Sequence, residues 1–183
     1  MQRNARNGVL SIVYTALASA LIAVSSCVVI PLPSAVAITL QSFGVYFALF
    51  FLGGRLGTLA VALYIAIGSI GLPVFSGFTG GIGRLFDASG GFILGFLFLA
   101  LAYWLLTSLF GERLRIVFAA VSLTVLYAFG ALWYSFVYIG VGDSELFAVL
   151  LTCVFPFIIP DALKIFLAAL VAKRLERIVK FSK

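Results

Sequence analysis

The chain has 183 residues, a formal net charge of +6, 64% hydrophobic residues and only 10% charged ones. Because an average soluble domain has about 45–50% apolar and about 25% charged residues, this composition excludes an ordinary water-soluble protein. Histidine is absent and the two cysteines lie far apart in the sequence, which excludes Ser-His catalysis and argues against a metal site. We therefore expect a membrane protein that is not an enzyme and has no cofactor.

Stretches without Asp, Glu, Lys or Arg follow one another along the chain, and a helix needs around 20 apolar residues to cross a bilayer core of about 30 Å. The first stretch contains Pro31 and Pro33, which indicate a turn between two helices because proline removes a backbone donor and fixes φ. The last apolar segment carries two charges. The sequence predicts six transmembrane helices, near residues 9–30, 36–53, 56–75, 88–109, 116–138 and 146–172.

These segments are apolar on every face, whereas a strand of a transmembrane β-barrel shows about 10 residues of alternating polarity. The predicted fold class is therefore all-α. Neither a linker, nor a low-complexity segment, nor an internal repeat of solenoid period divides the sequence. We expect a polytopic membrane protein in which residues 1–183 form a single membrane domain, a bundle of six transmembrane helices.

The charged residues sort by side when the predicted helices are threaded with the N-terminus inside. One side receives Arg3, Arg6, Arg55, Arg113, Arg115, Lys173, Arg174, Arg177, Lys180 and Lys183. The loops of the other side contain Arg84 as their one basic residue, together with Asp87, Asp143 and Glu145. Cytoplasmic loops favour Lys and Arg, so we expect a plasma-membrane protein with both termini in the cytoplasm. The basic face with aromatic platforms that nucleic-acid binding requires is missing.

The first predicted helix carries small residues at a spacing of four, Ala16 and Ala20, with Ser19 and Ala23 beside them. Small residues on one face of a membrane helix let another helix approach closely. The residues alone leave two interpretations of this face. It packs inside the bundle, or it docks on a separate membrane subunit.

Gln41 lies early in the second predicted helix, just after a turn on the outer side. Its amide offers both a hydrogen-bond donor and an acceptor. One interpretation is a hydrogen bond to a neighbouring helix, which is common for glutamine in a membrane. The other is a contact with a ligand.

The loop over residues 76–91 contains six glycines in sixteen residues. Glycine permits positive φ angles and close approach of the backbone to a ligand, so we interpret this outer loop as a lid. Its one cation, Arg84, either pairs with Asp87 or anchors a substrate carboxylate, to which a guanidinium presents a planar fork. A phosphate-binding loop is disfavoured because Gly-Lys-Ser/Thr does not follow.

The last predicted helix contains Asp161 and Lys164, preceded by Pro156 and Pro160. A charge inside a membrane span costs roughly 2.5–3.5 kcal/mol on insertion scales and therefore faces a cavity or a partner. Residues three apart lie on one helix face, so these two act as a unit. They form either an ion pair that only fixes packing or the polar end of a ligand pocket. The two prolines favour the pocket, because a broken helix around a buried charge often builds a binding site.

Several sequence motifs, taken in order and spacing, resemble the BioY family, the biotin-specific substrate-binding subunits of energy-coupling-factor transporters. The resemblance covers almost the whole chain. The resembling stretches are Ile38-Thr-Leu-Gln41, Phe51-Leu-Gly-Gly-Arg55-Leu-Gly57, Gly71-Leu-Pro-Val-Phe75, Gly80-Gly81, Gly90-Gly91-Phe-Ile-Leu-Gly95-Phe96 and Pro156-Phe157 through Asp161-Ala-Leu-Lys164.

This resemblance implies a six-helix bundle with biotin near the outer surface, under the loops that join helices 1–2 and 3–4. It assigns Gln41, Asp161 and Lys164 to the polar groups of biotin and gives Arg84 the role of the family's loop arginine. Family members commonly have Gly-Pro-Thr-Gly-Gly in the 3–4 loop, whereas this chain has Asp-Ala-Ser-Gly-Gly over 87–91. Aromatic candidates for contact with the biotin rings are Tyr64, Phe75 and Phe78.

The resemblance also implies partners. The chain has no nucleotide-binding motif, so ATP would be used by two ATPase subunits that act through a transmembrane coupling subunit. Ala16 and Ala20 match the small residues with which the family docks on that coupling subunit. The alternatives that stay open are a binding subunit for another vitamin and a facilitator of biotin uptake that works alone.

Overall fold

Backbone groups inside a bilayer have no water to bond, so a long apolar chain satisfies them internally by forming helices. The computed structural model describes the backbone of residues 2–30, 37–139 and 146–178 and the side chains of residues 8–30, 37–137 and 149–178. The helices are α1 (Gln2–Cys27), α2 (Gln41–Leu52), α3 (Gly54–Ile70), α4 (Gly90–Phe110), α5 (Arg115–Trp133), α6 (Leu146–Cys153) and α7 (Phe155–Ile178). Shorter elements are β1 (Val29–Ile30), β2 (Ile38–Thr39), η1 (Ile82–Leu85), η2 (Glu112–Leu114) and the π-helical turn η3 (Tyr134–Ile139).

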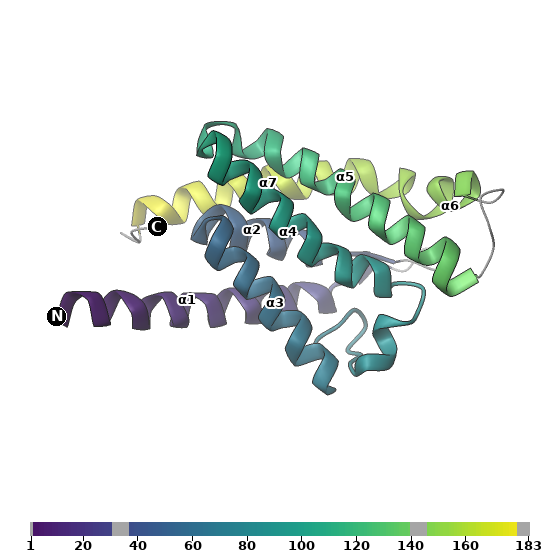
Figure 1. Cartoon of the computed structure of the whole chain (residues 1–183), viewed down its shortest axis with the longest axis horizontal. Coiled ribbons are helices and arrows are strands. Elements are labelled where there is room, and N and C mark those ends of the chain that lie inside the picture. Colours follow the sequence, from purple (N-terminus) through teal and green to yellow (C-terminus); the bar gives the residue numbers. More distant parts are fainter. Residues whose placement is uncertain (1, 31–36, 140–145, 179–183) are drawn as a thin grey trace.

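The helices lie side by side along the long axis of the molecule, and both termini are at the same end (Figure 1). The connection between β1 and β2, the loop before α4 and the connection before α6 are at the other end, which we call the loop end. Helix α2 contacts α1, α3 and α7. Its residues Tyr46, Leu49 and Phe50 are fully buried, so α2 forms the centre of the bundle.

Among the described residues, four helical segments are long and apolar enough to cross a membrane: Gly8–Cys27, Gly90–Phe110, Glu112–Val137 and Val149–Ile178. Helices α2 and α3 are apolar but shorter, with 12 and 17 residues. Each of the six predicted segments contains a helix. The lengths of these helices, taken alone, support four membrane crossings among the described residues.

Several predicted boundaries differ from those of the structure. The third helix, for example, ends at Ile70 and not at residue 75. The second helix begins at Gln41, because residues 38 and 39 form an antiparallel pair with β1. The last predicted helix is two helices, α6 and α7, separated at Val154. Pro156 lies in the first turn of α7, where a missing backbone N–H is tolerated. The predicted turn at Pro31 and Pro33 lies outside the described residues.

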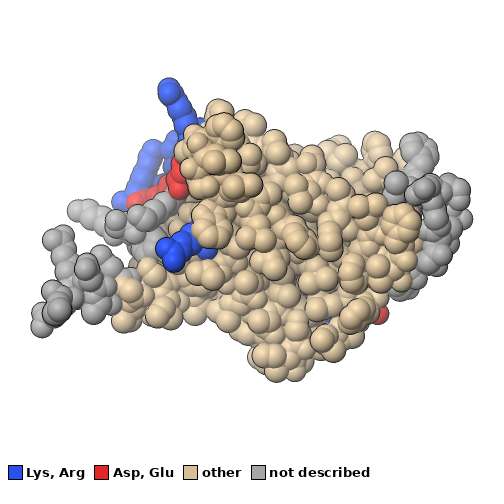
Figure 2. Space-filling model, in the orientation of Figure 1, with Lys and Arg blue, Asp and Glu red and all other residues tan. Residues whose placement is uncertain are grey.

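Charged side chains gather at the end that holds both termini, and most of the remaining visible surface is uncharged (Figure 2). The described cations at this end are Arg55, Arg113, Arg115, Lys173, Arg174 and Arg177. At the loop end, the described residues include a single cation, Arg84. The predicted sorting of charge is therefore present in the described part of the chain. Asp143, Glu145, Lys180, Lys183 and the side chains of Arg3 and Arg6 lie outside it.

Helices α2 and α3 meet at Gly53, whose φ of 82° is in the left-handed region that glycine adopts readily. This turn brings Gly57 of α3 against Leu49 of α2. A Cβ at Gly57 would lie 2.8 Å from the Leu49 Cα, which is too close for backbone atoms. The α2–α3 hairpin thus depends on the absence of a side chain at this position.

We expect Gly57→Ala to lower the thermal unfolding midpoint in detergent, because overpacking a core costs about 1–3 kcal/mol. The matched control is Gly8→Ala in α1, where an added Cβ meets nothing within 4 Å. Alanine is the better helix former there by about 0.8–1 kcal/mol. Equal midpoints for the two variants would contradict the close approach of α2 and α3.

Candidate ligand-binding site

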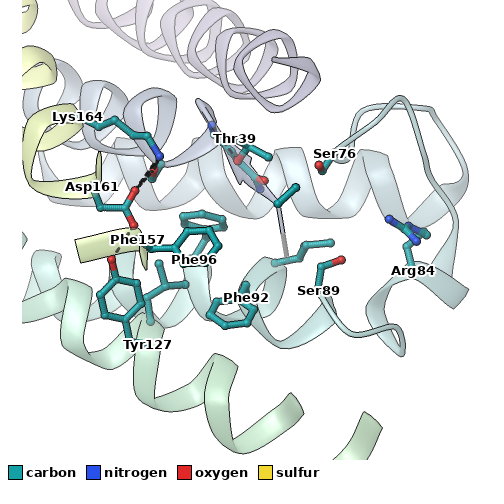
Figure 3. Close-up of a pocket in the computed structure, with 15 residues that line it drawn as sticks. Thr39, Ser76, Arg84, Ser89, Phe92, Phe96, Tyr127, Phe157, Asp161 and Lys164 are labelled. Carbon is teal, nitrogen blue, oxygen red and sulfur yellow. Dashed lines mark hydrogen bonds and ion pairs between the residues drawn. The ribbon is translucent and has the colours of Figure 1, made fainter. Parts of the chain in front are cut away.

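A cavity lies among β2, α2, the loop before α4, and helices α4, α5 and α7. Its lining residues are Ala37, Thr39, Gln41, Ser42, Ser76, Arg84, Ser89, Phe92, Ile93, Phe96, Leu126, Tyr127, Phe157, Asp161 and Lys164. All four of the predicted binding residues, Gln41, Arg84, Asp161 and Lys164, are therefore brought together around one space. Figure 3 shows that the space has a polar inner end, an aromatic middle and a loop at its outer end.

The inner end is a hydrogen-bonded ion pair. Lys164 Nζ lies 2.8 Å from Asp161 Oδ1 and donates to Ser42 Oγ at 3.2 Å. Ser42 in turn donates to Asp161 Oδ1 at 2.8 Å, and the Tyr127 hydroxyl donates to Asp161 Oδ2 at 2.7 Å. Asp161 and Lys164 are only 4% and 7% exposed. Both carboxylate oxygens thus have donors, as a charge in this environment requires.

The local sequence explains why this pair faces the cavity. Asp161 and Lys164 are three positions apart on α7, so they share one face. Pro160, inside the helix, has no N–H for the carbonyl of Pro156, four residues earlier. Ser42 comes from the first turn of α2 and Tyr127 from α5, so the network joins three helices.

Gln41 is the first residue of α2 and is 4% exposed. Its Nε2 has no hydrogen-bond partner among the described residues. Leaving a buried donor without a partner costs about 1–3 kcal/mol, so this amide has a free N–H for a ligand acceptor. The predicted bond from Gln41 to a neighbouring helix is not made by this nitrogen within the described part of the chain.

The middle of the cavity is aromatic. Phe92 and Phe96 of α4 and Phe157 of α7 lie between the ion pair and the outer loop (Figure 3). The sequence suggested other rings, and the structure places them elsewhere. Tyr64 and Phe75 pack edge to face in the core, with ring centroids 5.6 Å apart, and Phe78 is exposed on the loop.

Arg84 lies at the opposite end of the cavity from Asp161 and Lys164 (Figure 3). Its Nη1 pairs with Asp87 Oδ2 at 2.5 Å, and its Nε donates to Thr79 Oγ1 at 3.0 Å. The two predicted roles are thus compatible, because the guanidinium pairs with Asp87 and also lines the cavity. The Arg84 and Asp87 side chains are 34% and 46% exposed, so solvent screens this pair, unlike the inner one.

The loop that carries Arg84 is held by its own backbone. Phe75 and Thr79 form an antiparallel bridge, and Gly77 and Gly81 have φ angles of 72° and 95°. The amide of Gly81 also donates to the Gly68 carbonyl of α3 at 2.7 Å. These turns position the loop at the outer end of the cavity, where Ser76, Arg84 and Ser89 line it.

Ser42, Tyr127 and the three phenylalanines are lining residues that the sequence did not single out. All three phenylalanines lie within the motifs that carried the family resemblance, which was a usable signal. Ser42 and Tyr127 had none, because a lone serine or tyrosine in an apolar helix resembles ordinary packing. Their function becomes visible only when α2, α5 and α7 are brought together.

Ala16 and Ala20 lie on the exposed face of α1, whereas Ser19 and Ile22 of the same helix are buried. The exposed face continues as Ile12 and Val24, which are 72% and 66% exposed. Packing of Ala16 and Ala20 inside the bundle was the alternative prediction, and it is wrong. This apolar face of α1 is available to another hydrophobic surface.

The chain is similar over nearly its full length to proteins of one family. A model of the BioY family matches residues 1–181. This chain belongs to the BioY family. A BioY relative from Thermotoga maritima, named a biotin transporter, is 35% identical over 87% of this chain and 92% of its own length. One from Pyrococcus horikoshii, named a probable biotin transporter, is 34% identical over 77% of this chain and 81% of its own.

A solved structure confirms the resemblance at the level of the fold. The biotin S-component of an ECF-type ABC transporter matches with a TM-score of 0.83 and 26% sequence identity, covering 94% of this chain and 93% of its own. The predicted family is therefore confirmed. This BioY chain is a helical membrane bundle, and its apolar helices make it a multi-pass membrane protein.

We expect Asp161→Asn to lower the thermal unfolding midpoint substantially, because it leaves the Lys164 ammonium buried without its counter-charge. Breaking a buried ion pair from one side costs about 3–5 kcal/mol. The matched control is Asp87→Asn, which removes the carboxylate of the exposed pair with Arg84 and costs at most about 1 kcal/mol. Thermal unfolding of both variants in the same detergent gives the comparison, and similar shifts would contradict the role of the inner pair in stability.

Proposed function

We propose that this chain is the biotin-binding membrane subunit of an ECF-type importer, which captures biotin at the loop end of the bundle. The observation that carries the proposal is the order of chemistry along the cavity. A neutral but strongly polar inner end is followed by an aromatic middle and a guanidinium at the outer end. Biotin has the same order: a ureido ring, an apolar thioether ring with its alkyl chain, and a carboxylate.

The ureido group has two N–H donors and one carbonyl acceptor. Asp161 supplies carboxylate acceptors. Lys164 and the Gln41 Nε2, which has no partner among the described residues, supply donors. Because Asp161 and Lys164 neutralise each other, the inner end recognises a neutral polar group better than an ion, which would arrive with its own uncompensated charge. The ureido ring therefore belongs at the inner end.

The carboxylate of biotin then lies at the outer end, toward Arg84. The exposed Arg84–Asp87 pair contributes little to stability, so exchanging the Asp87 carboxylate for that of the ligand has a low cost. The apolar part of biotin is left beside Phe92, Phe96 and Phe157, where burial contributes about 25 cal/mol per Å². Thr39, Ser76 and Ser89 add hydroxyl groups along the wall.

The proposed topology has six crossings of the cell membrane, with both termini in the cytoplasm. The described cations at the end that holds the termini support this orientation, since cytoplasmic segments favour Lys and Arg. The loop end then faces outward. Helices α2 and α3 complete the six crossings as a hairpin, of which α2 lies at the centre of the bundle.

Transport requires partners in this proposal. The sequence has no nucleotide-binding motif, so a transmembrane coupling subunit and two ATPase subunits supply the energy for release inside. The exposed face of α1, with Ala16 and Ala20 at its centre, is the proposed docking surface for the coupling subunit. Its small side chains allow close helix contact.

The first test is a titration of the purified chain in detergent with biotin, followed by heat or tryptophan fluorescence. Saturable binding is expected, and its loss in Asp161→Asn protein that is still folded at the temperature of the titration would link it to this cavity. Absence of binding by the unmodified chain would overturn the biotin assignment. Riboflavin and thiamine are the ligands to titrate next in that case.

The orientation of the ligand is tested by comparing biotin with biotin amide, which lacks the negative charge. We expect Arg84→Gln to weaken biotin about tenfold or more, because a hydrogen bond to a charged group contributes about 1.5–3 kcal/mol. Biotin amide should bind both proteins alike. An equal loss for the two ligands in Arg84→Gln would place the carboxylate elsewhere.

The docking face is tested with Ala16→Trp and Ala20→Trp. We expect both variants to bind biotin normally in detergent and to lose co-purification with the coupling subunit, because the indole prevents close helix contact. Val121→Trp is the matched control, since Val121 is an exposed apolar residue of α5. Undiminished co-purification of the α1 variants would contradict this docking surface, and ATPase-independent uptake would favour a facilitator.

A further inference from the structure

A second groove lies at the end of the bundle that holds both termini, between the start of α5 and the last turns of α7. Its walls are formed by η2 and α5 on one side and by α7 on the other. The groove is far along the bundle from the candidate biotin site, which is at the loop end. Nothing in the proposed biotin chemistry uses it.

The groove changes from apolar to basic along both of its walls. On α7, Phe166 and Leu170 are followed by Lys173, Arg174 and Arg177. These positions are spaced by three or four residues and therefore form one stripe on the helix. On the other wall, Ile116 and Val117 lie beside Arg113 and Arg115, in the same order from the middle of the bundle to its end.

Most of the positive charge in this groove is not neutralised within the described part of the chain. Arg115 pairs with Glu176 at 3.4 Å, and the described residues provide no ion-pair partner for Arg113, Lys173, Arg174 or Arg177. The apolar lining is exposed as well, including Phe166, Leu170, Ile116 and Val117. An occupant must therefore have an anionic head and an apolar body.

We propose that this groove binds an anionic phospholipid of the cytoplasmic leaflet, with its phosphate among Arg113, Lys173, Arg174 and Arg177 and its acyl chains along Phe166 and Leu170. Basic pockets between transmembrane helices on this side of a membrane bind such head groups. The depth of the groove in the membrane also fits a phospholipid, because the change from apolar to charged lining marks the boundary between hydrocarbon and head groups.

A lipid fits this groove better than a protein partner. Helices α5 and α7 lie on the opposite side of the bundle from α1 (Figure 1), whose small-residue face is the proposed docking surface for the coupling subunit. A partner docked there leaves the α5–α7 side toward the surrounding lipid. The lipid would connect α5 to α7 across the groove and so stabilise the end of the bundle.

Native mass spectrometry of the purified full chain tests this proposal with phosphatidylglycerol and phosphatidylcholine of identical acyl chains. We expect retention of phosphatidylglycerol in preference to phosphatidylcholine. One cation near an anionic surface contributes about fivefold in affinity, so the triple variant Lys173→Gln, Arg174→Gln, Arg177→Gln should lose phosphatidylglycerol by at least about tenfold. The single variant Arg174→Gln should lower the affinity for phosphatidylglycerol about fivefold. It replaces the triple variant in the test if the triple variant does not fold.

The matched control is Arg55→Gln, an exposed cation at the same end that lies outside this groove. Equal losses for Arg174→Gln and Arg55→Gln would overturn the proposal, because the attraction would then be a general property of the charged end. Competition by millimolar glycerol phosphate equal to that of the lipid would also overturn it, since a free anion would suffice. Unchanged lipid retention in the triple variant, with loss of the coupling subunit, would assign the groove to a protein instead.

Discussion

The ion pair between Asp161 and Lys164 is the interaction on which the rest of this structure depends. A single charge in an apolar bundle is costly, and here two opposite charges neutralise each other at 2.8 Å. Ser42 and Tyr127 complete the hydrogen bonds of the carboxylate, so the pair fixes the positions of α2, α5 and α7 together. The cavity lies directly beside this network, and Ser42, Tyr127, Asp161 and Lys164 all line it.

Much of the fold was predictable from the sequence because the lipid environment restricts the choices. Long uncharged stretches predicted helices, and the positions of Lys and Arg predicted which ends of the helices lie together. The strands β1 and β2 and the break at Val154 were not predictable, since a pair of two-residue strands has no periodicity to detect. The start of α2 was misplaced for the same reason, since the apolar run that predicted a helix over 36–53 also includes the residues of β2.

The candidate site was predictable where a residue type is unusual for its surroundings. Asp161, Lys164, Arg84 and Gln41 stood out because charged or amide groups are rare in apolar helices, and all four line the cavity. The aromatic wall was not predictable in this way, since the chain contains 19 phenylalanines and others, such as Phe50 and Phe118, pack in the hydrophobic core instead. Which rings face the cavity depends on helix rotation, and that is decided by packing over the whole bundle.

The two ion pairs that line the cavity differ in burial, so water and salt reach the outer pair much more than the inner one. Mobile salt ions surround the exposed Arg84–Asp87 pair and screen its charges over about 8 Å at physiological ionic strength. The same ions have no access to the buried Asp161–Lys164 pair. The electrostatic interactions at the outer end of the cavity therefore depend on the ionic strength of the medium. Those at the inner end stay the same at low and at high ionic strength.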